Sequence, residues 1–356
     1  VLSRLLERDS CLLEGIVEDG ERLCDSLRHA AESGEPVRLD YLTTRAASSV
    51  VLFLMFGRRL EFDEAAFREG SKQLMQVLFG MSSPSIDEEA MRGLRALQAK
   101  AQGAFDAVTR PELEELMSEV KSGRRSPGRR HCMMESLLRE EPRYMDGGLE
   151  ALLADTRVFI NAGYETTAHA LSFAVGLLAE PRNARAAERA RREAVDVMGS
   201  GLRRETLLDR TAYFDSVFLE ALRLFPLAPS LGGVAYTDFE VEVGGTSYLV
   251  PKGAALSFHN VSGQRCPRIF EEPENFRPER WQGTSQSKLM TFNLGAHACP
   301  GRNLSMLEAR VFLPMMLSRF RFELLDGNDV VTSTEDMLQR PVDGMPLKVF
   351  CLQSVA

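Results

Sequence analysis

The sequence predicts a mainly α-helical protein with a small β region late in the chain. Long stretches carry apolar residues at helical spacing, and the clearest runs from residue 148 to residue 179. Strand-type alternation first appears at residues 239–243, and a Gly-Gly turn separates this segment from a second short strand at 247–250. With 44% hydrophobic and 26% charged residues, the composition is that of a globular chain with a sizeable core.

Each expected helix is bounded by glycine, proline or a polar turn. Apolar periodicity predicts helices over 11–33, 42–56, 63–79, 87–120, 148–179, 181–198, 207–224 and 303–320. Pro111 should interrupt the 87–120 helix and Pro314 should kink the last one, since proline lacks the N–H that a helix interior needs. Residues 80–85 should form a loop. The basic loop 121–130 is either a solvated turn or a contact for an acidic partner or membrane.

Charge and cysteine usage exclude several classes of protein. A net charge of −8 argues against nucleic-acid binding. The six cysteines contain no C-x-x-C pair, so they indicate neither a zinc site nor a disulfide framework, and reduced thiols in an intracellular setting fit best. The first ten residues lack the apolar core of a secretory signal. The run 50–56 is much shorter than the roughly 20 residues that span a bilayer.

The segment 292–301 is the strongest chemical signal. It reads F-x-x-G-x-x-x-C-x-G, with Phe292, Gly295, Cys299 and Gly301 at the specified positions, and an expected helix follows it. Glycines let a backbone turn tightly and approach a flat partner, and a thiolate is stabilised at a helix N-terminus. These properties suit a metal-binding cysteine, whereas the plainer alternative is a buried structural cysteine.

A second signal, A-G-Y-E-T-T at 162–167, lies inside the most apolar expected helix. Gly163 weakens a helix, and Glu165 is a poor choice for a buried face. The Thr166 hydroxyl can bond the Ala162 carbonyl and open a groove for a small ligand, and with Glu165 it would make a short proton relay. The alternative is a helix kink with a satisfied threonine. His169, one turn further on, is expected to be packed or exposed rather than catalytic.

A third signal is weak by itself. Glu220 and Arg223 are three residues apart on one helix face, a spacing common among exposed pairs of little energetic value. Arg280 follows downstream in the segment P-E-R-W at 278–281.

Taken in chain order, the segments 162–167, 220–223 and 278–281 and the cysteine loop 292–301 resemble the motifs of the cytochrome P-450 superfamily, the haem-thiolate monooxygenases. The resemblance implies a cytochrome P-450 fold, with residues 1–356 as a single haem-thiolate domain. It also implies that the fold is N-terminally incomplete, without the family's first strands, first helices and any membrane anchor.

The resemblance further assigns roles to residues. Cys299 would be the axial ligand of a haem b (iron protoporphyrin IX), and His297 would hydrogen-bond a propionate. Other cofactor-binding positions would be Phe292, Gly295, Gly301, Ala162 and Gly163. Thr166 and Glu165 would deliver protons to dioxygen, and Glu220, Arg223 and Arg280 would form a buried ion network behind the cysteine loop.

The implied reaction inserts one atom of dioxygen into a small apolar organic substrate. Electrons would come from a separate reductase or ferredoxin, because the chain carries no flavin or nucleotide motif. One alternative is a haem-thiolate isomerase or dehydratase, a class that tends to lack the Thr166–Thr167 pair; another is a non-catalytic truncated remnant. The expected location is intracellular, at the endoplasmic reticulum membrane if a preceding segment carries an anchor.

The substrate pocket and the haem contacts are less determined. Phe159, Asn161, Ala162 and the segment 229–234 would line a pocket of mixed apolar character. The segment 231–234 lacks the family's usual propionate-binding arginine, with Gly233 in its place. We therefore expect the 148–179 helix and the 292–301 loop to face each other across a gap open on one flank, and haem to be held loosely or not at all.

Overall fold

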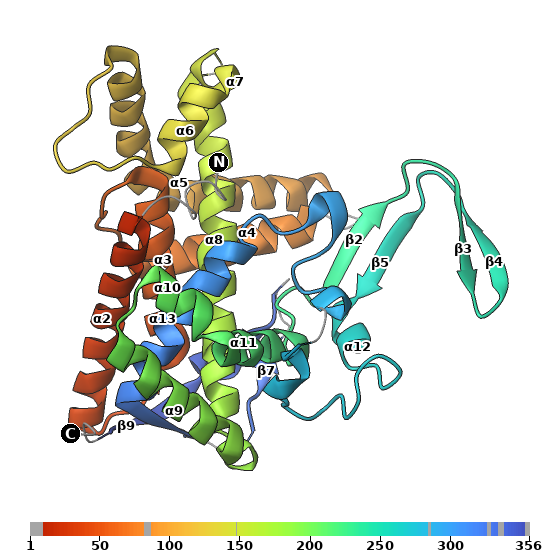
Figure 1. Cartoon of the computed structure of the whole chain (residues 1–356). Coiled ribbons are helices and arrows are strands. Elements are labelled where there is room, and N and C mark those ends of the chain that lie inside the picture. Colours follow the sequence, from red (N-terminus) through yellow and green to blue (C-terminus); the bar gives the residue numbers. More distant parts are fainter. Residues whose placement is uncertain are drawn as a thin grey trace.

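Helix α8 (Gly148–Ala179) runs through the middle of the helical body, and helices from both halves of the chain pack around it (Figure 1). The computed structural model describes residues 10–352, apart from 82–86, 147, 284–285, 326–328 and 334–337. From Thr167 to Leu178 every residue of α8 is buried. This burial explains why its sequence is apolar on all sides rather than on one stripe.

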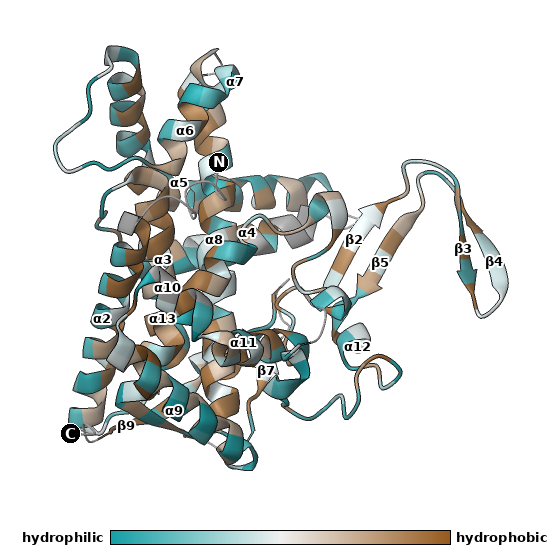
Figure 2. Ribbon diagram, in the orientation of Figure 1, coloured by the Kyte–Doolittle hydropathy of each residue, from teal (hydrophilic) through white to brown (hydrophobic). Residues whose placement is uncertain are grey.

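The predicted helices are present, with small shifts of their ends. The other helices of the described residues are α2 (Ser10–Ser33), α3 (Leu39–Phe56), α4 (Glu64–Met81), α5 (Glu88–Ser122), α6 (Met133–Glu140), α7 (Pro142–Asp146), α9 (Ala184–Ser200), α10 (Arg204–Asp209), α11 (Ala212–Leu224), α12 (Asn260–Gln264) and α13 (Arg302–Arg319). The expected loop 80–85 lies outside the described residues from 82 onward, and 80–81 still belong to α4. Helix α9 is mostly hydrophilic (Figure 2), because only Ala190, Ala194 and Val197 of it are buried.

Two helix predictions were wrong in detail. The expected interruption at Pro111 does not occur, and α5 continues through it for 35 residues. Phe105 packs before the proline and Leu113 and Leu116 after it, so tertiary contacts hold both sides in line. The single helix expected over 207–224 is instead split into α10 and α11, because the Thr211 hydroxyl bonds the Leu207 carbonyl and competes with the backbone ladder. Pro314 lies inside α13 without ending it.

Short antiparallel ladders form the β region. Strand β9 (Pro346–Cys351) pairs with both β1 (Val37–Arg38) and β6 (Phe320–Leu324), which links the two ends of the described chain. The predicted hairpin, β3 (Phe239–Val243) and β4 (Thr246–Val250), is confirmed, and Gly244 and Gly245 both take positive φ, at 58° and 80°. The hairpin projects from the body beyond the paired strands β2 (Ser230–Val234) and β5 (Ala255–His259) (Figure 1). Strands β7 (Thr332–Ser333) and β8 (Arg340–Pro341) make a further pair.

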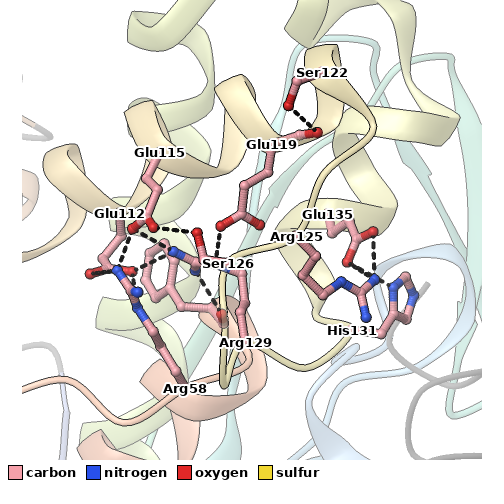
Figure 3. A network of polar contacts seen from close by, with 11 residues as sticks. Arg58, Glu112, Glu115, Glu119, Ser122, Arg125, Ser126, Arg129, His131 and Glu135 are labelled. Atoms are coloured by element: carbon pink, nitrogen blue, oxygen red, sulfur yellow. Dashed lines mark hydrogen bonds and ion pairs between the residues drawn. The ribbon is translucent and has the colours of Figure 1, made fainter.

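The basic loop 121–130 is held by the protein's own carboxylates (Figure 3). Arg129 has a fully buried side chain and bonds Glu112, Glu115, Glu119 and the carbonyl of Phe56. Arg125, from the same loop, bonds Glu135 at the start of α6. These pairs join α3, α5 and α6, so much of the loop's positive charge is neutralised within the molecule.

Among the described residues, α3 is the one helix long and apolar enough to cross a membrane. It is 67% buried and lies along α8. A core helix passes the same length and composition test, and the packing of α3 is that of a core helix.

Candidate active site

One stripe of α8 is open, although the helix is fully buried from Thr167 to Leu178. Ala154, Val158 and Ala162 are exposed, with Val158 at 66%, and Thr166 is half-buried. Residues four apart lie on the same helix face, so these side chains form a continuous apolar strip that ends at a hydroxyl. Such a strip can bind an apolar molecule and present one proton-donating group at its end.

Thr166 is held as the sequence predicts. Its Oγ1 donates a hydrogen bond to the Ala162 carbonyl at 2.9 Å. Gly163 has a different neighbour from the one expected, since its α-carbon faces α3 and a Cβ there would lie 3.0 Å from Cγ2 of Val51. Close packing of α3 against α8 therefore explains the glycine without a ligand.

Glu165 points away from the open stripe into the protein. Its Oε2 lies 2.5 Å from the Ser71 hydroxyl on α4, and its Oε1 lies 2.9 Å from Nη2 of Arg340 on β8. Burial raises the pKa of this carboxyl, but His169 and Arg340 outweigh burial and lower it. None of the hydrogen bonds among the described residues joins Glu165 to Thr166, so the side-by-side relay expected from the sequence is not formed in this conformation.

Asn161 shares this buried cluster. Its Oδ1 lies 2.7 Å from the Ser71 hydroxyl, and its side chain is buried against α4. The expectation that Asn161 lines a substrate pocket is therefore wrong for this structure, whereas Ala162 is exposed as a lining residue should be. Of the other expected lining residues, Phe159 is half-buried and β2 is largely exposed.

The cysteine loop is built from left-handed turns. Asn293 and Gly295 have φ values of 56° and 65°, and the Asn293 side chain accepts a bond from the Leu294 N–H at 2.8 Å. The Cys299 N–H closes the loop by donating to the Phe292 carbonyl at 2.7 Å. The thiol of Cys299 is exposed, and α13 begins three residues later at Arg302.

This donor set fits a haem thiolate. The exposed sulfur stands just before the N-terminus of α13, where a metal ion could reach it. Leu294, Ala296 and Ala298 expose small or apolar side chains on the same loop, as a flat apolar ligand requires. A Cβ at Gly301 would lie 3.8 Å from the sulfur, an ordinary contact, so the chain alone does not require glycine there.

His297 ends the short 3₁₀ turn η4 (Gly295–His297) and is exposed. The expectation that it binds a propionate stays a prediction, as does the haem-wide gap between α8 and the cysteine loop. Cys299 belongs to a hollow of about 140 Å³ that Phe292, Leu294 and Arg302 also line.

The predicted contacts of the ion network are present around the buried helix α11. Arg223 and Glu220 are fully buried and joined by two bonds of 2.9 Å, and Nε of Arg280 lies 3.2 Å from Glu220. The other N–H groups of Arg223 bond the carbonyls of Gln264, Pro273 and Asn275, so all five of its donors are used. Both charges are thus paired and hydrogen-bonded, as buried charges must be.

Trp281 is a further member of the network, and its role was not predicted from the sequence. Its indole N–H donates to Oε2 of Glu220 at 2.9 Å. The other carboxylate oxygen, Oε1, accepts a bond from the backbone N–H of Arg277, also at 2.9 Å. The signal was present in the sequence, since Trp281 directly follows Arg280 in the P-E-R-W segment. Ser71 and Arg340, the partners of Glu165, carried no local signal because they come from segments far away in the sequence.

The helical body, the exposed cysteine loop and the threonine-bearing helix together define the class of haem-thiolate proteins. The sequence model of the family described as Cytochrome P450 matches residues 2–348, and the chain belongs to this family.

Several curated proteins are similar to the chain. Cytochrome P450 3A13 of Mus musculus is 31% identical over 56% of this chain and 40% of its own length. Cyclooctat-9-en-7-ol 5-monooxygenase of Streptomyces melanosporofaciens is 30% identical over 86% of this chain and 66% of its own length. Ent-kaurenoic acid oxidase 1 of Hordeum vulgare is 26% identical over 96% of this chain and 67% of its own length. The chain thus spans 40% to 67% of the length of these relatives.

Proposed function

We propose that the protein is a haem-thiolate monooxygenase that inserts one atom of dioxygen into an apolar organic substrate. The observation that carries this proposal is the exposed Cys299 thiol, held in a closed loop ahead of α13, in a chain of the cytochrome P450 family. Haem b bound through Cys299 would supply the oxygen activation that a thiolate ligand favours. The names of two relatives, a monooxygenase and an oxidase of organic compounds, support the same type of reaction.

The chain's own residues would bind and orient the substrate and move protons. Val158 and Ala162 offer an apolar surface on which a bound apolar substrate would displace water from one side of α8. Thr166 ends this surface with a hydroxyl whose hydrogen is directed to the Ala162 carbonyl, so the oxygen keeps its lone pairs free to accept a second hydrogen bond. That hydroxyl would pass a proton to the site after its hydrogen turns away from the Ala162 carbonyl.

Electrons would come from a separate reductase or ferredoxin, and the location would be intracellular. Among the described residues, no group of three or more His, Cys, Asp or Glu side chains could hold a further metal ion. The proposed chemistry therefore rests on Cys299 as the metal ligand.

The absorbance spectrum of the reduced, carbon-monoxide-bound protein tests the proposal. A haem thiolate gives a red-shifted Soret band, and Cys299→Ser should abolish it because a hydroxyl stays protonated where a thiol ionises. Cys351→Ser is the matched control, since Cys351 is also exposed, and it should keep the band. A wild-type protein reconstituted with haem but lacking the band, or a Cys299→Ser variant retaining it, would overturn the proposal. Turnover of a hydroperoxide without any reductant would favour an isomerase or dehydratase instead.

A further inference from the structure

A row of charged side chains crosses the interior between α3, α8 and β8. Asp40, His169 and Glu165 are all buried, with His169 and Glu165 each 3% exposed. Nδ1 of His169 lies 2.5 Å from Oδ1 of Asp40, and Nε2 lies 3.5 Å from Oε1 of Glu165. Arg340 contacts the same Oε1 at 2.9 Å, so the charges alternate in sign along the row.

The geometry defines the charge of His169. Each ring nitrogen faces a carboxylate, and only an imidazolium carries an N–H on both. Burial lowers the pKa of this imidazole, but the carboxylates of Asp40 and Glu165 outweigh burial and raise it to about 9. The 3.5 Å separation from Glu165 is an ionic contact rather than a short hydrogen bond.

Glu165 depends on this arrangement for its ionisation. Burial favours the neutral acid, and the ionic contact with His169 is the largest influence that opposes it. The neighbours of the carboxylate are His169 on its own helix, Arg340 on β8 and Ser71 on α4. Together they turn it away from the open stripe on which Thr166 lies.

We propose that His169 is a positioning residue: held as a buried imidazolium by Asp40, it keeps the Glu165 carboxylate ionised and turned away from Thr166. The chemical significance of this arrangement rests on the proposed function, in which Glu165 is the acid beside Thr166. The arrangement implies that the Glu165 side chain reaches the open stripe only after its contacts with Arg340 and His169 break. The charge and orientation themselves are properties of the chain without haem.

The titration of His169 is measured by NMR on the full chain without haem. The chain has five histidines, and the His169 ring signal is the one lost in His169→Gln. Its midpoint should lie near 9 and fall by about two units in Asp40→Asn, which keeps the shape but removes the charge. His29→Gln, at an exposed site, is the control and should leave the midpoint unchanged. A wild-type midpoint near or below the ordinary value of 6.5 would overturn the proposal, whatever the protein catalyses.

The protonation of Glu165 gives a second, independent readout. Infrared difference spectra between acid and neutral pH should show that the wild-type Glu165 is ionised at neutral pH, identified by the signal lost in Glu165→Gln. In His169→Gln the neutral acid should persist at higher pH, because Arg340 and Ser71 remain to oppose burial but the imidazolium charge is gone. An unchanged carboxyl titration in a folded His169→Gln protein would remove His169 from this role. Failure of the monooxygenase proposal would show instead in the carbon-monoxide spectrum and leave both titrations intact.

Discussion

The indole N–H of Trp281 donates to Oε2 of Glu220 at 2.9 Å, and this bond ties the segment after α12 to the buried helix α11. Glu220 is fully buried, and its two oxygens accept from Arg223, Arg280, Trp281 and the Arg277 backbone. The carboxylate thus joins a helix to a loop that contains little regular structure.

Trp281→Phe should destabilise the protein by about 2 kcal/mol, because a hydrogen bond to a charged group contributes roughly 1.5–3 kcal/mol. Urea unfolding followed by circular dichroism measures the change. Tyr248→Phe, which removes a hydroxyl from an exposed ring of β4, is the control and should change stability little. Equal stability of Trp281→Phe and the wild type would show that the bond contributes nothing.

Arg223→Ala should cost about 3–5 kcal/mol, because it leaves the Glu220 charge buried without its main partner. The loss should appear as a large fall in the urea midpoint or as failure to fold. Arg277→Ala is the matched control: the Arg277 side chain pairs with the exposed Glu271 and Glu272, and such pairs contribute about 0–1 kcal/mol. A small effect of Arg223→Ala, similar to that of Arg277→Ala, would contradict the structural role of the network.

Thr166→Ala should leave the fold intact and separate oxygen consumption from product formation. The hydroxyl bonds the Ala162 carbonyl of its own helix and lies on the open stripe, so its loss removes a proton donor without a cavity in the core. Product formed per reductant consumed should fall by up to about one hundred-fold, the lower end of what a positioned proton donor contributes. Thr166→Ser keeps the hydroxyl and should retain coupling. An unchanged ratio in Thr166→Ala would remove Thr166 from the mechanism.

Glu308 on α13 should make stability fall as the pH rises. Burial, with the nearby charge of Asp19 adding to it, raises the pKa of Glu308 well above its ordinary value, and neither of its oxygens has a hydrogen-bond partner among the described residues. The folded state therefore keeps a proton that the unfolded state loses, so stability falls as the pH rises above the unfolded pKa of about 4.3.

Glu308→Gln should remove this dependence and raise the urea midpoint more at pH 8 than at pH 5. Glu32→Gln, at an exposed position of α2, is the control and should leave the pH profile unchanged. If wild-type stability is flat between these pH values, or Glu308→Gln alters both midpoints equally, Glu308 does not carry the raised pKa.

The sequence was sufficient where the information is local. Periodicity identified α8 from Gly148 to Ala179, and the Gly244–Gly245 pair identified the hairpin, because both depend on neighbouring residues. The hydrogen bond from Thr166 to Ala162 spans one helical turn and was equally predictable.

Sequence reasoning failed where a distant segment decides the outcome. Glu165 was expected to act with its neighbour Thr166, but Arg340, 175 positions further along the chain, and Ser71 on α4 hold its carboxylate. Strand β2 was not predicted because Ser230–Val234 has little strand character without its partner β5. Pro111 was expected to break a helix that packing on both sides keeps continuous.

Trp281 is the only tryptophan in the chain and is 6% exposed. Its fluorescence therefore comes from one position, against Glu220 in the ion network, with no second indole to average over. Emission should shift to longer wavelength when this segment separates from α11 and admits water. If the shift precedes the loss of helix signal during unfolding, the segment opens as a unit before the helical body; if the two transitions coincide, the whole chain unfolds cooperatively.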